Sequence, residues 1–133
     1  MSQENVEVVV AFFQAYNGGD IDAVMSFFAP DVQAFPDASV FPEADPLHGR
    51  EDLKRWFEET AWAWVNPTAV VREVIVTEDG RVLVRFDWGG EGVASGIETT
   101  SSFTGVHMVR DGVISRVEWY ADHDKAVAVG LAE

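Results

Sequence analysis

The second half of the chain alternates apolar and polar residues as β-strands do, and this pattern limits the possible folds more than any other feature. Residues 97–109 form a long strand that reaches an Asp-Gly turn, and residues 114–121 form the returning strand. The valine-rich residues 69–77 and the alternating residues 82–88 add two strands, joined by a Glu-Asp-Gly turn. The pattern predicts an antiparallel sheet, bent where Gly105 interrupts the longest strand.

The first half shows helical spacing instead. Apolar residues within 6–16 recur at intervals of three and four, and a glycine pair ends this helix. Asp20 caps a second, short helix that runs to Pro30. A third helix begins at Gly49, carries Trp64 on its buried stripe and ends just beyond it. The remaining expected elements are a short strand at 32–35, a flexible connector at 89–96 and a short C-terminal helix at 124–131.

Helices followed by antiparallel strands indicate an α+β protein. The 133 residues suit a single domain spanning residues 1–133, and their 47% apolar content is enough for a real core. We therefore expect a curved antiparallel sheet wrapped around the N-terminal helices, a cone-shaped α+β barrel. Such an arrangement leaves a cavity between the sheet and the helices.

Residues 36–47 form a proline-rich segment without helical or strand periodicity. Loops of this length that lack secondary structure are often lids or binding segments. The alternative interpretation is a mobile surface loop, and the sequence favours neither.

Charge and composition exclude several classes of function. A formal net charge of −14 opposes binding to nucleic acid or to an anionic membrane surface. The chain has no cysteine, and its three histidines do not form a pair with metal-ligand spacing, so we expect no metal site. It has no dinucleotide or phosphate-loop fingerprint. A polar, acidic N-terminus without an apolar core predicts a cytoplasmic protein.

Several short motifs are spread over essentially the whole chain: NGGD at 17–20, FFAPDV at 27–32, HGREDL at 48–53, VRDGVI at 109–114 and WYAD at 119–122. Together they resemble the nuclear transport factor 2-like superfamily. Within it, the chain is most similar to the SnoaL-like polyketide cyclase and ketosteroid-isomerase-like branch. The resemblance implies a cone-shaped α+β barrel with a deep pocket, a homodimer, and no metal or organic cofactor. Because the superfamily includes isomerases, cyclases, epoxide hydrolases and non-catalytic modules, it does not define an activity.

The resemblance also implies positions for a site. The isomerase-type tyrosine falls near Phe12, which cannot donate a hydrogen bond, and Tyr16 lies one turn later. The isomerase general base falls near Asp37, and the second acid falls near Gly105. The terminal carboxylate of SnoaL-like proteins matches Asp122. These positions make ketosteroid isomerisation doubtful and leave acid–base chemistry at Asp122 open.

Two titratable residues near the C-terminus also have structural interpretations. A carboxylate that faces an apolar pocket has a raised pKa and can act as a base near neutral pH, but Asp122 also suits the N-cap of the last helix. His107 has the same strand parity as Phe103, so both should face the cavity if one does. His107 could then assist a carboxylate or protonate an enolate, or it could be an ordinary core or interface histidine.

The aromatic residues of the chain could line a cavity for a flat apolar ligand, although aromatic residues at helical or alternate spacing more often build a plain core. We expect Phe13, Trp56, Phe86, Phe103 and Trp119 to line the cavity and contact a small apolar molecule. One hypothesis is a cofactor-independent enzyme that acts on a carbonyl compound by proton transfer, cyclisation or hydration. It would use the set Asp122, His107, Asp37 and Tyr16. The alternative is a non-catalytic ligand-binding or dimerisation module of the same fold.

Overall fold

The computed structural model describes residues 2–42, 44–60 and 64–131. Three helices lie in the first half, and a fourth closes the chain. A six-stranded sheet fills the space between them. The helices are α1 (Ser2–Gly18), α2 (Ile21–Met25), α3 (Gly49–Thr60) and α4 (His123–Leu131). The strands are β1 (Phe28–Phe35), β2 (Leu47–His48), β3 (Trp64–Val76), β4 (Val82–Gly92), β5 (Glu98–Arg110) and β6 (Val113–Tyr120).

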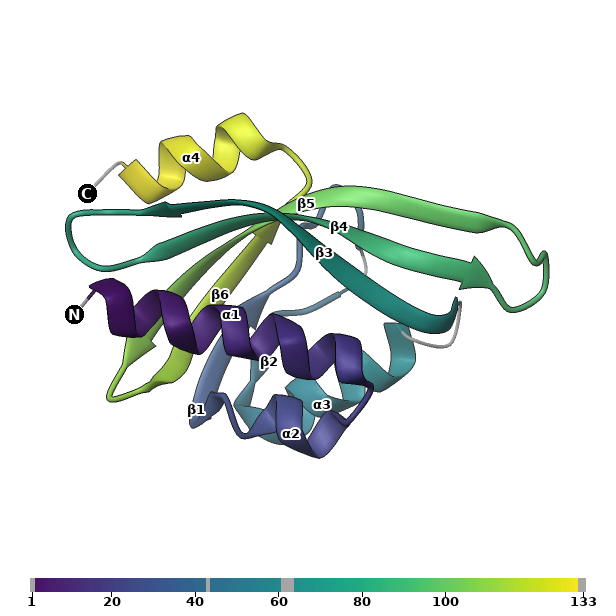
Figure 1. Ribbon diagram of the computed structural model, residues 1–133, viewed down its shortest axis with the longest axis horizontal. Coiled ribbons are helices and arrows are strands. Elements are labelled where there is room, and N and C mark those ends of the chain that lie inside the picture. Colours follow the sequence, from purple (N-terminus) through teal and green to yellow (C-terminus); the bar gives the residue numbers. More distant parts are fainter. Residues whose placement is uncertain (1, 43, 61–63, 132–133) are drawn as a thin grey trace.

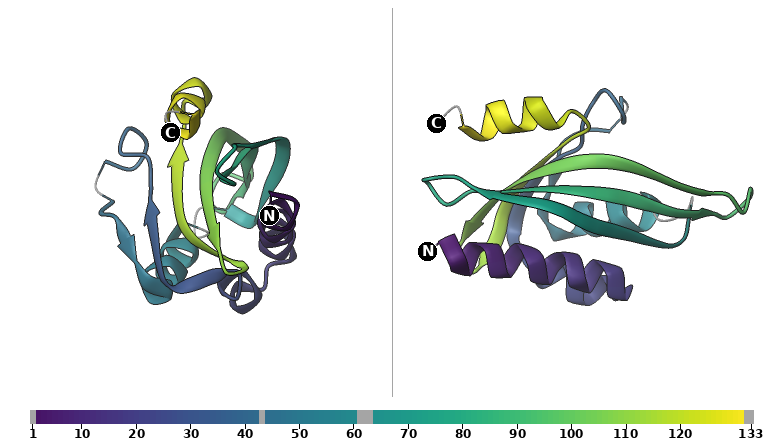
Figure 2. Two further views of the ribbon diagram at one scale, coloured as in Figure 1. Left: turned by 90° about the vertical axis from the view of Figure 1, so that its left-hand side faces the viewer. Right: turned by 45° about the horizontal axis from the view of Figure 1, so that its top comes forward.

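The sheet has the order β2-β1-β6-β5-β4-β3, curves strongly and remains open at its two edge strands (Figures 1 and 2). Four of the five strand pairs are antiparallel, whereas β1 runs parallel to β6. The predicted α+β fold, with a curved sheet over N-terminal helices, is confirmed. The sheet is mixed rather than purely antiparallel, because β1 is separated from β6 in sequence and joins it through a long crossover.

The sheet has a different cover on each face (Figure 1). Helices α1, α2 and α3 lie on the concave face, and the larger core cluster fills the space between them and the sheet. Helix α4 lies on the opposite face, where its Ala126 packs against Leu83 and Val106. Strand residues whose side chains point to opposite faces therefore enter two separate hydrophobic clusters.

Two predicted helix ends are wrong. Helix α2 ends at Met25, so Phe28 begins strand β1 instead of continuing the helix to Pro30. Helix α3 ends at Thr60, and Trp64 begins β3, where it pairs with Gly92. Backbone pairing with an extended β4 thus outweighs the helical spacing of Trp64, while Trp62 lies outside the described residues.

Half of the predicted flexible connector at 89–96 is strand. Residues 89–92 continue β4 and pair with β5. At Gly89, an added Cβ would lie 2.0 Å from the Thr99 carbonyl oxygen, so only glycine fits this close approach of two strands. The glycines here allow close pairing instead of flexibility.

Candidate functional site: an aromatic cavity

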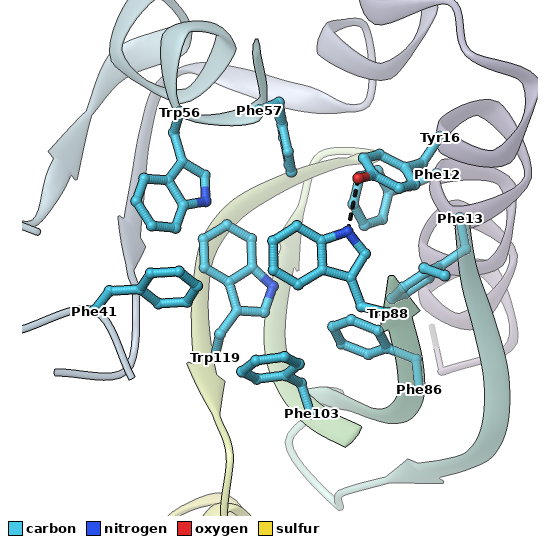
Figure 3. Close-up of a pocket in the computed structure, with 11 residues that line it drawn as sticks. Phe12, Phe13, Tyr16, Phe41, Trp56, Phe57, Phe86, Trp88, Phe103 and Trp119 are labelled. Carbon is cyan, nitrogen blue, oxygen red and sulfur yellow. Dashed lines mark hydrogen bonds between the residues drawn. The ribbon is translucent and has the colours of Figure 1, made fainter. Parts of the chain in front are cut away.

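A cavity of about 50 Å³ lies between the concave face of the sheet and the helices (Figure 3). Helix α1 contributes three of the lining residues, and α3 and β4 contribute two each. Strands β3, β5 and β6 and the loop before β2 contribute one residue each. All lining residues except one alanine are aromatic. They are Phe12, Phe13, Tyr16, Phe41, Trp56, Phe57, Ala69, Phe86, Trp88, Phe103 and Trp119.

Regular secondary structure brings most of these rings together. Phe12, Phe13 and Tyr16 share one side of α1, because residues three and four apart in a helix face the same way. Phe86 and Trp88 are two apart in β4 and therefore point to the same face. The five residues predicted to line the cavity, Phe13, Trp56, Phe86, Phe103 and Trp119, all do so.

Four aromatic wall residues were missed, although sequence signals existed for three of them. On the helices, Phe12 directly precedes the predicted wall residue Phe13, and Phe57 directly follows Trp56. On the sheet, Trp88 has the strand parity of Phe86. Phe41 had no such signal, because it lies in the aperiodic loop. Its ring packs against Trp56, with ring centroids 4.8 Å apart and planes at 80°.

The loop that carries Phe41 has a defined local structure. The amides of Val40 and Phe41 both donate to the Asp37 carbonyl oxygen, at 3.1 and 2.8 Å. The side chain of Asp37 accepts hydrogen bonds from the Ser39 amide at 2.8 Å and from the Ala121 amide at 2.7 Å. Asp37 thus ties the start of this loop to the end of β6.

The pKa of Asp37 suits this structural role. Partial burial raises the pKa, but hydrogen bonds donated by Ala121 and Ser39 outweigh burial and hold it below its usual value. A carboxylate with a lowered pKa is a weak base at neutral pH. Asp37 does not line the cavity.

Tyr16 supplies a polar group to the cavity wall. Its hydroxyl oxygen accepts a hydrogen bond from the Trp88 indole Nε1 at 2.7 Å (Figure 3). Within the described residues, no acceptor lies within hydrogen-bond distance for the hydroxyl proton of Tyr16. Burial raises the pKa of Tyr16, although the indole N–H opposes this, so the phenol stays protonated at neutral pH. Tyr16 can therefore donate a hydrogen bond into the cavity.

His107 faces the same side of the sheet as Phe103 but does not line the cavity. It is fully buried behind Phe12 and Phe13, whose ring centroids lie 6.2 and 5.9 Å from the imidazole. Gly105 makes room for the imidazole, because a Cβ there would lie 2.7 Å from His107 Cε1. His107 is thus part of the core next to the cavity.

The hydrogen bonding of His107 defines its protonation state. Its Nδ1 lies 3.0 Å from the Val82 carbonyl oxygen, and since a carbonyl only accepts, Nδ1 carries the proton. Nε2 is then an acceptor, and it has no hydrogen-bond partner among the described residues. Burial lowers the pKa of His107 to about 4, despite the bond to Val82, so the ring is neutral at pH 7.

Asp122 lies on the protein surface, away from the aromatic cavity. Its Oδ1 accepts a hydrogen bond from the Lys125 amide at 3.2 Å, and its carbonyl accepts from the Ala126 amide at 3.1 Å. These contacts are those of a helix N-cap, in this case for α4. Asp122 and His107 therefore do not meet in one cavity, contrary to the expectation that linked them.

Asp122 instead borders a separate open hollow of about 470 Å³, which we call the α4 hollow. There the side chain of His123 connects two neighbours. Its Nδ1 lies 2.8 Å from Thr104 Oγ1, and its Nε2 lies 3.5 Å from Glu73 Oε1. The α4 hollow is lined by Ser39, Arg85, Ser102, Phe103, Thr104, Ala121, Asp122 and His123.

Within the described ranges, no group of three or more histidine, aspartate or glutamate side chains is placed to hold a metal ion. None of the described helices has both the length and the apolar character needed to span a bilayer.

Solved structures with the same fold include several proteins named for polyketide chemistry. A putative polyketide cyclase from Sinorhizobium meliloti is 27% identical, with 85% of this chain and 93% of that chain covered and a TM-score of 0.67. A putative polyketide cyclase from Xanthomonas campestris pv. campestris is 24% identical, with 96% of each chain covered and a TM-score of 0.75. The epoxide hydrolase/cyclase-like enzyme SalBIII, which has a role in pyran ring formation in the polyether salinomycin, is 20% identical. In that comparison 89% of this chain and 90% of that chain are covered, and the TM-score is 0.76.

No match is found among curated proteins. The SnoaL-like domain matches residues 9–117, which is most of the chain and includes ten of the eleven residues around the aromatic cavity. Together with the shared fold, this match confirms the resemblance drawn from the sequence motifs. The chain belongs to the SnoaL-like domain family.

Proposed function

We propose that this chain binds a small, mostly apolar, carbonyl-bearing molecule in the aromatic cavity. The observation that carries the proposal is the Tyr16 hydroxyl, a protonated donor on a wall that is otherwise built from aromatic rings and one alanine. Apolar surface of the ligand would be removed from water by the rings. A carbonyl oxygen would accept the proton that Tyr16 has available.

The Trp88 indole strengthens this argument. By donating to the Tyr16 oxygen at 2.7 Å, it fixes the hydroxyl and polarises the O–H bond. A ligand without an acceptor would leave this donor unpaired in an apolar site, which costs about 1–3 kcal/mol. The cavity therefore favours a carbonyl compound over a hydrocarbon of the same shape.

Binding without turnover is the form of the proposal that the candidate acid–base residues favour. Asp122 caps α4, Asp37 holds the loop, and His107 is bonded to a backbone carbonyl behind the cavity wall. Each already has a structural partner. The catalytic hypothesis, in which Asp122 is the base and His107 its partner, would require both side chains to leave these positions.

A second candidate function is a reaction at the ligand carbonyl, with Tyr16 as the proton donor. The fold neighbours named as polyketide cyclases and as an epoxide hydrolase/cyclase-like enzyme favour this candidate, since those names imply reactions of oxygenated carbon skeletons. In this reaction the Tyr16 hydroxyl would stabilise negative charge developing on the carbonyl oxygen. Binding is common to both candidates, so it is tested first.

The test compares benzaldehyde with toluene, which has a similar shape but no acceptor, by titration of intrinsic tryptophan fluorescence. Tyr16→Phe should weaken benzaldehyde binding about tenfold, the value of about 1.4 kcal/mol for one hydrogen bond, and leave toluene unaffected. Tyr120→Phe is the matched control, because that hydroxyl is on β6 and contacts Glu118. Equal affinities of benzaldehyde for the wild type and Tyr16→Phe would refute the proposal.

The homodimer implied by the family resemblance remains part of the proposal. Sedimentation velocity across a tenfold range of protein concentration measures it directly. The mass of two chains should predominate, and a single-chain mass throughout would refute the homodimer.

A further inference from the structure

A second hollow lies directly outside the aromatic cavity. This open hollow of about 590 Å³, which we call the loop hollow, is bounded by the loop before β2 and by α3. Phe41 and Trp56 line both the cavity and the loop hollow, so their two rings form the partition between them. The partition is a T-shaped contact with ring centroids 4.8 Å apart.

The volumes make this partition significant. An apolar cavity that accepts benzene measures about 150 Å³, whereas the aromatic cavity measures about 50 Å³. A single ring therefore needs more room than the aromatic cavity offers while the Phe41 ring is in place. Displacement of the Phe41 ring would supply this room and join the cavity to a hollow of about 590 Å³.

Phe41 is suited to be the part that moves. It is half-buried and comes from a loop, whereas its neighbours Trp88 and Phe103 are held in paired strands. Its backbone is fixed by hydrogen bonds to Asp37 and Ala44, so the ring can change rotamer while the loop stays in place. Centroid distances of 6.4 and 6.5 Å from Phe41 to Trp88 and Phe103 show that its ring occupies space a flat ligand could take.

The loop hollow differs from the cavity in charge. Three carboxylates line it, and its guanidinium, that of Arg55, lies 3.6 Å from Asp52 Oδ1. An anionic group placed there would meet a net negative potential, which the overall charge of −14 reinforces. The three carboxylates are Asp45, Asp52 and Glu59.

We propose that the cavity and the loop hollow are two parts of one binding site, with the Phe41 ring as a displaceable plug between them. The ligand is an elongated, uncharged, multi-ring carbonyl compound. Its carbonyl end lies at Tyr16, its first ring takes the place of Phe41, and its far end lies in the loop hollow. This inference rests on the proposed function and adds the size and charge of the ligand to it.

A plug lowers the apparent affinity, because ligand binds only to the fraction of molecules in which Phe41 is displaced. Phe41→Ala removes the plug and should tighten binding of methyl 6-acetyl-2-naphthoate about tenfold, with a faster association rate. Val93→Ala is the control, since Val93 is an exposed apolar residue that lines neither the aromatic cavity nor the loop hollow. The free acid, 6-acetyl-2-naphthoate, should bind at least about threefold more weakly than the ester, because its carboxylate is repelled in the loop hollow. High salt screens this repulsion, so the difference in affinity should shrink.

The outcomes separate the two proposals. Weaker binding of the ester to Phe41→Ala would make Phe41 an ordinary wall residue and overturn the plug. If Tyr16→Phe still weakened binding in that case, the proposed function would stand. Equal binding of the acid and the ester would overturn the placement of the far end in the loop hollow. Failure of the ester to bind either the wild type or Phe41→Ala would overturn the joined site, whereas the comparison of benzaldehyde with toluene would still decide the proposed function. Thermal unfolding of each variant confirms that it is folded.

Discussion

Strand β5 has two different environments on one face of the sheet. At Phe103 this face borders the aromatic cavity, whereas at His107, four residues later, it is closed by the rings of Phe12 and Phe13. The two residues have the same parity, so what differs is the element across from them. Loop and tryptophan side chains surround Phe103, while α1 packs over His107. Strand parity therefore determines the face of a side chain, and the opposing elements determine whether a ligand can reach it.

The largest predicted loss of stability comes from comparing a residue of the tightly packed core with a residue of the cavity wall. Phe28 is fully buried and packs against Phe12 and Phe57, at ring-centroid distances of 5.1 and 6.3 Å. Phe28→Ala should lower the free energy of unfolding by about 3–5 kcal/mol. Phe103→Ala should cost about half of that, because the cavity side of this ring already lacks contacting atoms.

Urea unfolding measures both free energies, and titration with benzaldehyde measures the consequence for binding. Phe103→Ala should weaken binding, whereas Phe28→Ala should not. Equal losses of stability in the two variants would mean that the cavity wall is packed as tightly as the core, which would contradict the comparison.

The burial of His107 under helix α1 should also affect how stability depends on pH. The folded state holds the pKa of His107 at about 4, against 6.5 for the free side chain, so between these values the unfolded state binds more protons. Stability should be complete above pH 6.5 and fall by about 3 kcal/mol as the pH drops to 4. Among the described residues, the imidazole contacts phenylalanine rings, Gly105 and a backbone carbonyl, and none of them forms an ion pair with it that would offset this loss.

Urea unfolding at closely spaced pH values checks this prediction, with His107→Gln as the variant that cannot titrate. The variant should be less stable at pH 7 but should lose little further stability between pH 6.5 and 4. His48→Gln is the control for replacing a histidine outside the core, since His48 is exposed on β2. A wild-type slope that persists in His107→Gln would place the titrating group elsewhere.

The parts of the site that could be predicted are those that periodic elements determine. Helical spacing placed Phe13 and Trp56 toward the interior, and strand alternation placed Phe86 and Phe103 on one face. These side chains have few alternatives once the helix or strand forms, because a shift of register would expose a whole apolar face. The α+β fold followed from the same patterns and from the family motifs.

The parts that could not be predicted depend on contacts between segments distant in sequence. Phe41 is in a loop whose path is fixed by the bond from Asp37 to the Ala121 amide, 84 residues away. Trp64 has helical spacing but joins a strand, because β4 extends far enough to pair with it. The parallel pairing of β1 with β6 has no local sequence signal at all.

Asp122 shows most clearly how one residue fits two roles in a sequence, and its replacement should have the smallest effect. As the N-cap of α4, Asp122 should contribute about 1 kcal/mol to stability, so Asp122→Ala should lower the free energy of unfolding by that amount. Asp122→Asn should cost much less, because asparagine caps helices about as well as aspartate. The affinities for benzaldehyde and toluene should not change in either variant, since Asp122 lies outside the aromatic cavity.

The two variants also separate capping from catalysis. A general base requires the carboxylate, so Asp122→Asn would abolish a base-catalysed reaction while keeping the cap. Asp122→Ala would remove both. If a carbonyl substrate is found and Asp122→Asn turns it over as fast as the wild type, then Asp122 acts only through α4. If Asp122→Asn is stable but inactive, the surface carboxylate takes part in the reaction, and the α4 hollow rather than the aromatic cavity becomes the place to look for the reacting atoms.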